Sequence, residues 1–118
     1  MEKILLVEDD IALAEQMKRF LEETRKCRVN ITLTLDEALK NAHQNYDLLI
    51  TDKNLGGHRG IHPLLDYMKE EKPYTPVLLA SGEEGIQARR ELYCHDFWDK
   101  DDIDEFLGKV DKLLSKAA

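Results

Sequence analysis

The chain has 118 residues, of which 42% are hydrophobic and 35% charged, so we expect one globular domain over residues 1–118 and exclude a disordered chain. Its apolar runs are too short to span a membrane and its N-terminus lacks a signal-peptide pattern, so we expect a cytoplasmic protein, away from the membrane, whose two cysteines (Cys27 and Cys94) are free thiols. A net charge of −7 repels phosphate backbones and argues against direct nucleic-acid binding.

The first part of the chain alternates short apolar runs with segments of helical period. Residues 4–7 form an apolar run that ends in acids, which predicts a strand buried on both faces. Apolar residues then recur three and four positions apart, which predicts an amphipathic helix (Leu13, Met17, Phe20 and Leu21). Residues 27–34 alternate and are β-branched, which predicts an edge strand, and residues 35–42 predict a short helix.

The same alternation continues through the middle of the chain. Residues 48–51 predict a second buried strand that ends at Asp52, and residues 54–60 contain three glycines and predict a loop. A third helix is expected over residues 61–68, with Pro63 in its first turn, where proline is tolerated. Residues 76–80 predict a strand that ends at Ser81.

The last part of the chain contains the weakest and the clearest helical patterns. Residues 83–92 predict only a weak helix, because Gly85 and two arginines interrupt its apolar stripe. Residues 95–98 predict a short strand before Lys100, and residues 103–114 have a continuous apolar stripe. Asp102 and Glu105 stand at the spacing of a capping box at the start of this helix.

Five strands that alternate with helices predict an α/β fold with a five-stranded parallel sheet, doubly wound, with helices on both faces. Right-handed crossovers bring the carboxyl ends of all the strands to one edge, where ligand sites of such sheets form. Polar residues stand at four of these strand ends (Glu8 and Asp9, Asp52, Ser81, and Lys100). We therefore expect three carboxylates, a hydroxyl and an ammonium group in one pocket.

Three close carboxylates repel one another unless a cation joins them, and all-oxygen ligands favour Mg²⁺. A carboxylate can also act as a nucleophile and form an acyl phosphate. The transferred phosphoryl group then needs positive charge and hydrogen-bond donors at its oxygens, which Mg²⁺, Lys100, the Ser81 hydroxyl and backbone N–H groups after Asp52 can supply.

With these residues, the chain resembles the receiver domain of two-component response regulators over essentially its whole length. The resemblance implies a flavodoxin-like strand order of 2-1-3-4-5 and a phospho-accepting aspartate at Asp52, in the segment DLLITDKNLGG. It also implies a Mg²⁺ site in which Asp9 is a direct ligand, Glu8 acts partly through water, Asp52 also binds, and Asn54 contributes its backbone carbonyl.

The resemblance further implies a switch and a set of partners. Ser81, in PVLLASG, matches the switch hydroxyl, and Phe97 matches the aromatic residue that moves inward on activation. Lys100, in DFWDKDD, matches the lysine that contacts the phosphoryl group. The implied donor is a sensor histidine kinase or a phosphotransfer protein, the output is an unidentified protein target, and the chain is a signalling domain, not a turnover enzyme.

Simpler interpretations exist for the same residues. Glu8 and Asp9 can be acids that favour a helix N-terminus, and Asp52 alone can be a turn residue. The other candidates can be an ordinary strand-end hydroxyl (Ser81), part of a solvated acidic helix start (Lys100) and an ordinary core residue (Phe97). For Glu8, Asp9, Asp52 and Lys100, the register of the whole set favours the site.

The chain departs from the family pattern at several positions. Gly56 and Asp101 stand where the family usually has proline, and the interval from Ser81 to Lys100 is a few residues shorter. Because a cis bond before a non-proline residue is costly, we expect a trans Lys100–Asp101 peptide and a remodelled loop.

Two alternatives remain open, and the departures motivate the first of them. One is a receiver-fold binding module that signals without phosphorylation. The other is an aspartate-nucleophile phosphatase, which we rank last because Asn54 stands where such enzymes carry a second acid, and an amide cannot transfer the proton.

Overall fold

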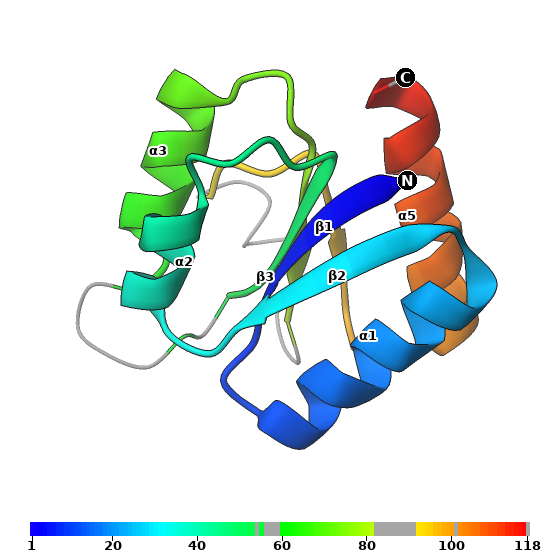
Figure 1. The fold of residues 1–118 in the computed structure, drawn as a ribbon. Coiled ribbons are helices and arrows are strands. Elements are labelled where there is room, and N and C mark those ends of the chain that lie inside the picture. The colour runs from blue at the N-terminus through cyan, green and yellow to red at the C-terminus, as the bar shows by residue number, and fades with distance from the viewer. Residues whose placement is uncertain (54, 56–59, 82–91, 101, 118) are drawn as a thin grey trace.

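The computed structural model describes residues 1–53, 55, 60–81, 92–100 and 102–117, in which strands and helices alternate (Figure 1). The strands are β1 (Glu2–Val7), β2 (Cys27–Thr32), β3 (Leu48–Asp52), β4 (Val77–Ala80) and β5 (Asp96–Trp98). The helices are α1 (Ile11–Thr24), α2 (Leu35–Asn41), α3 (His62–Glu71) and α5 (Ile103–Ala117). The weak helix expected over residues 83–92 and most of the loop expected over residues 54–60 lie outside the described residues.

The five strands form one sheet in the order β2-β1-β3-β4-β5, and every neighbouring pair is parallel. This order confirms the predicted α/β fold with a doubly wound parallel sheet, and it confirms that β2 is an edge strand. In Figure 1, α1 and α5 cover one face of the sheet, and α2 and α3 cover the other.

Each face of the sheet has its own hydrophobic core. Alternate residues of β1 show this, because Ile4 and Leu6 pack with α1 and α5, whereas Leu5 and Val7 pack with α2 and α3. The same alternation places Trp98 in the first core and its neighbour Phe97 in the second. A strand buried on both faces has no polar side, which explains why its sequence is a continuous apolar run.

Side chains that accept backbone hydrogen bonds set the helix starts. The Asp10 carboxylate accepts from the Leu13 N–H at 3.2 Å, and the Thr34 hydroxyl accepts from the Glu37 N–H at 3.1 Å. Thr34 therefore belongs to the start of α2, which is why β2 ends at Thr32 and not at the predicted residue 34.

Two further predictions about local structure are also borne out. Pro63 lies in the first turn of α3, as expected. Cys27 and Cys94 are free thiols. No helix in the described ranges combines the length and apolar character that crossing a bilayer requires.

Candidate functional site

The strand register brings the predicted site residues to one edge of the sheet. Val7 at the end of β1 is paired with Thr51 of β3, and Asp52 is paired with Ala80 of β4. Glu8 and Ser81, which each follow the last residue of a strand, therefore lie near Asp52.

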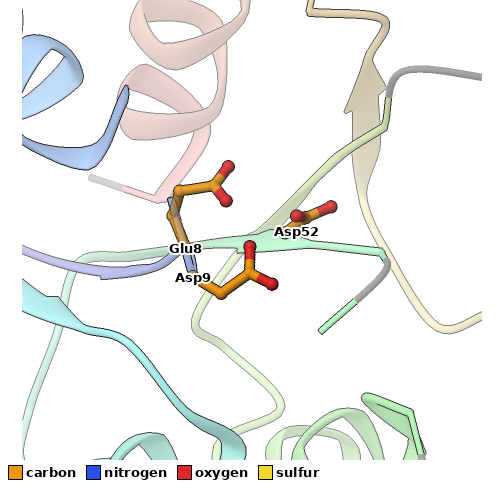
Figure 2. Close-up of side chains that lie close together, drawn as sticks. All are labelled: Glu8, Asp9 and Asp52. Carbon is orange, nitrogen blue, oxygen red and sulfur yellow. The ribbon is translucent and has the colours of Figure 1, made fainter. Parts of the chain in front are cut away.

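Glu8, Asp9 and Asp52 form an acidic cluster in which one carboxylate oxygen of each residue lies within 4.8 Å of the others. Figure 2 shows the three carboxylates pointing toward a common space, two from the end of β1 and one from the end of β3. Glu8 and Asp52 are buried, with 2% and 7% of their surface exposed, whereas Asp9 is exposed. The cluster is therefore buried at Glu8 and Asp52 and exposed to solvent at Asp9.

The three consecutive acids after β1 divide between two roles. Asp10 is the N-cap of α1, as the simpler interpretation of this segment holds. Glu8 instead points into the cluster, and its Oε2 accepts the Asp10 N–H at 3.1 Å. That hydrogen bond fixes the Glu8 side chain at the base of the pocket.

Lys100 brings the one ammonium group that the described residues place in the cluster. Its Nζ lies 2.7 Å from Glu8 Oε1 and 3.3 Å from Asp52 Oδ2. The Lys100 backbone has a φ of +60°, in the left-handed region that residues with a side chain rarely adopt. Residues held in such conformations cost free energy and persist only where surrounding contacts fix them.

Comparison with known families decides the identity of the fold. The family model described as response regulator receiver domain matches residues 4–109. The chain belongs to the response regulator receiver domain family.

Solved receivers share this architecture closely. The non-phosphorylated HemR receiver domain of Leptospira biflexa is 33% identical, with a TM-score of 0.84, and the match covers 98% of this chain and 95% of that chain. Response regulator TrrA of Thermotoga maritima, solved in complex with Mg²⁺ and BeF, is 26% identical, with a TM-score of 0.84 and coverage of 96% and 99%. CheY4 of Vibrio cholerae is 19% identical and has the same fold, with a TM-score of 0.82. That match covers 96% of this chain and 98% of the CheY4 chain. No curated protein matches.

The electrostatics of the receiver pocket are set by burial and by Lys100. Burial raises the pKa of Glu8; the hydrogen bonds from Lys100 and Asp10 oppose this, and the neighbouring acids Asp9 and Asp52 add to it. Burial alone would lower the pKa of Lys100, but its hydrogen bond to Glu8 and the charge of Asp52 outweigh that effect and raise it. The protonated, positively charged form of Lys100 is therefore favoured in the pocket, whereas the ionised form of Glu8 is disfavoured.

The donor set fits a hard divalent cation. Three carboxylates and one ammonium group leave the ionised pocket with two uncompensated negative charges, and the ligand atoms are all oxygens. Glu8, Asp9 and Asp52 are the described residues that would hold Mg²⁺. Asn54, whose backbone carbonyl is the fourth expected ligand, lies outside the described residues.

The two expected switch residues belong to the strands next to the pocket, Ser81 directly after β4 and Phe97 within β5. Ser81 is fully buried, and its N–H donates to the Trp98 carbonyl at 2.9 Å. Phe97 is buried in the core between the sheet and α2 and α3. Lys109 Nζ lies 5.2 Å from the centre of the Phe97 ring and donates to the Phe97 carbonyl.

Sequence reasoning left two features of this region unrecognised. The indole N–H of Trp98 donates to the Asp102 carbonyl at 2.9 Å, across the segment that carries Lys100. Lys109 of α5 contacts the expected switch aromatic. In the sequence, Trp98 is only a lone tryptophan two residues before Lys100, and Lys109 is only a lysine within a helix. Neither pattern predicts these contacts by itself. The expected trans peptide between Lys100 and Asp101 involves Asp101, which lies outside the described residues.

Proposed function

We propose that this receiver accepts a phosphoryl group on Asp52 in a Mg²⁺-dependent reaction and passes the signal to a protein partner through a conformational change. The convergence of Glu8, Asp9 and Asp52 with Lys100 carries the proposal. The complex of the 26%-identical TrrA with Mg²⁺ and BeF supports it, because that relative binds the metal together with BeF. The donor we propose is a sensor histidine kinase or a phosphotransfer protein, and we propose that the receiver acts in the cytoplasm, with residues 1–118 as one domain.

The reaction uses the groups already in the pocket. One Asp52 carboxylate oxygen attacks the phosphorus, the phosphorus–nitrogen bond of a phosphohistidine donor breaks, and its electron pair leaves on the imidazole nitrogen. Lys100, whose Nζ lies 3.3 Å from Asp52 Oδ2, is placed to stabilise negative charge on the transferred group. Bound Mg²⁺ supplies further positive charge to the phosphoryl oxygens. The Ser81 hydroxyl, at the end of the neighbouring strand, is the proposed donor that couples the phosphorylated pocket to Phe97.

The test is the intact mass of the protein after incubation with acetyl phosphate and Mg²⁺. The wild type should gain one phosphoryl group, and Asp52→Asn should gain none. Asp66→Asn is the matched control, since it makes the same change at an exposed position on α3. Uptake that persists in Asp52→Asn, or that proceeds at the same rate in EDTA, would overturn the proposal.

A second candidate is a binding module that signals without phosphorylation. The observation that favours it is the Lys100–Glu8 contact of 2.7 Å, shorter than the Lys100–Asp52 contact, which offers Glu8 a partner other than a metal. Such a module would show neither phosphoryl uptake nor Mg²⁺ binding. Calorimetric titration with Mg²⁺ therefore separates the two candidates independently of any phosphoryl donor.

A further inference from the structure

The connection between β5 and α5 has to hold Lys100 in an unfavourable conformation. Its φ of +60° lies in the left-handed region, and glycine, the residue that enters this region freely, is absent from the connection. A residue held there needs surrounding contacts that determine the conformation. In this chain, the contacts of Trp98 are placed to determine the backbone conformation of Lys100.

A hydrogen bond from the Trp98 side chain joins the two ends of this connection. Its indole N–H donates to the Asp102 carbonyl at 2.9 Å, and the same carbonyl accepts the Phe106 N–H at 3.1 Å in the first turn of α5. The Asp102 carboxylate accepts the Asp104 N–H at 2.9 Å and so caps the helix. One side chain therefore ties the last residue of β5 to the first turn of α5, with Lys100 between them.

Trp98 is itself held firmly enough to serve as an anchor. It is 4% exposed, and its ring centre lies 4.5 Å from that of Phe106 at an interplanar angle of 38°. Its carbonyl accepts the Ser81 N–H at 2.9 Å, which joins it to the end of β4. The indole therefore has a fixed position relative to both the sheet and α5.

Lys100 has another direction in which its side chain can lie. A cavity of about 270 Å³ opens between α1 and α5, and Lys100 lines it together with Trp98 and residues of both helices (Leu13, Gln16, Met17, Phe20 and Ile103). A long side chain beside open space loses conformational freedom when it is held in one geometry. Although Lys100 lines this cavity, its ammonium reaches Glu8 and Asp52, so the backbone turn has to favour that one direction of the side chain.

We propose that Trp98 is a positioning residue for Lys100: its indole N–H bond to the Asp102 carbonyl fixes the turn that aims the Lys100 ammonium at the carboxylates. This inference rests on the proposed function insofar as Lys100 acts on a phosphoryl group. Trp98 has two links toward the pocket, the indole bond to the Asp102 carbonyl and the bond that its carbonyl accepts from the Ser81 N–H, and Trp98→Phe removes only the first.

The test compares two variants that remove different parts of this arrangement. Trp98→Phe keeps an aromatic ring against Phe106 but loses the N–H donor, whereas Phe106→Leu keeps the donor and loses the contact between the two rings. Trp98→Phe should slow phosphoryl uptake from acetyl phosphate by roughly twofold to tenfold, the loss expected for one hydrogen bond. Phe106→Leu should lower the urea midpoint more and leave the rate of uptake of the folded protein unchanged.

A double-mutant cycle shows whether the effect passes through Lys100. In a Lys100→Met background, Trp98→Phe should cause no further loss of rate, because the group that it positions is already gone. A rate unchanged by Trp98→Phe alone, or a loss of the same size in both backgrounds, would overturn the inference.

A second measurement keeps the inference separate from the proposed function. If the wild type takes up no phosphoryl group, the proposed function fails, and nuclear Overhauser contacts between the Lys100 and Glu8 methylene protons then decide the role of Trp98. Loss of these contacts in Trp98→Phe, with retention in Phe106→Leu, supports the positioning role. Contacts that persist in both variants overturn it.

Discussion

Lys100→Met should bind Mg²⁺ more tightly than the wild type while accepting a phosphoryl group more slowly. In the wild type, the Lys100 ammonium lies 2.7 Å from Glu8 Oε1 and 3.3 Å from Asp52 Oδ2, so it competes for two of the three carboxylates that would ligate the metal. Methionine keeps a linear side chain of similar length but carries no charge. The substitution therefore removes the competitor and leaves the carboxylates in place.

The size of the effect follows from these two contacts. A pair of unit charges about 4 Å apart is worth about 1 kcal/mol in water, and exposed ion pairs are worth about that or less. The Lys100 side chain is 19% exposed and makes two such contacts, both shorter than that distance. Relieving them should favour Mg²⁺ by about 1–2 kcal/mol, which is roughly fivefold to thirtyfold in the dissociation constant. Phosphoryl uptake should fall by roughly 10²–10³, the usual loss for a donor to developing negative charge.

Calorimetric titration of Mg²⁺ measures the affinity, and Trp98 fluorescence provides a second signal because Trp98 and Lys100 line the same cavity. Lys112→Met is the control, since it removes one positive charge from an exposed position on α5 and reports any long-range effect of net charge. An affinity for Lys100→Met that equals or falls below that of the wild type would refute the idea that Lys100 and the metal compete for Glu8 and Asp52.

Three further predictions concern stability. Glu8→Gln should stabilise the metal-free protein at neutral pH, because burial raises the pKa of Glu8 and wild-type stability is therefore lost as pH rises through that pKa. The urea midpoints of the variant and the wild type, measured in EDTA from about pH 4 to about pH 8, should diverge as pH rises. Parallel curves for the two proteins would contradict this. Asp10→Ala should lower the free energy of unfolding by about 1 kcal/mol, since it removes the acceptor of the Leu13 N–H; a loss of Mg²⁺ affinity in calorimetry would instead place Asp10 in the metal site. Burial lowers the pKa of His95, whose Nδ1 accepts the Val77 N–H at 3.0 Å, so stability should be lost as pH falls below about 6.5. His95→Asn should flatten this dependence, and an unchanged slope would assign it to other groups.

The architecture was predictable because each buried strand is an apolar run that ends at a polar residue. The runs ending at Glu8 and Asp52 marked both the strands and the pocket edge, since parallel strands bring their carboxyl ends together. The exact strand ends were less predictable. β1 begins at Glu2, two residues before the apolar run, because backbone pairing with Cys27 continues where the side chains are already polar.

The roles of individual side chains in the pocket were harder to predict. Three consecutive acids after β1 are equivalent in the sequence, and only the geometry of the turn makes Asp10 the helix cap and leaves Glu8 in the cluster. The contact between Lys100 and Glu8 joins residues 92 positions apart. The bond from the Trp98 indole depends on the orientation of α5 against β5, which no local pattern encodes.

The sheet separates two hydrophobic cores whose buried residues form distinct clusters, one under α1 and α5 and the other under α2 and α3. Free-energy changes from well-separated substitutions in the two cores should therefore add, because side chains without shared neighbours couple weakly. Substitutions in one layer should then need few compensating changes in the other, except where Lys109 of α5 contacts Phe97. In evolutionary terms, the fold lets a receiver diversify one helical surface while its other surface, and the chemistry at the shared sheet edge, remain as they were.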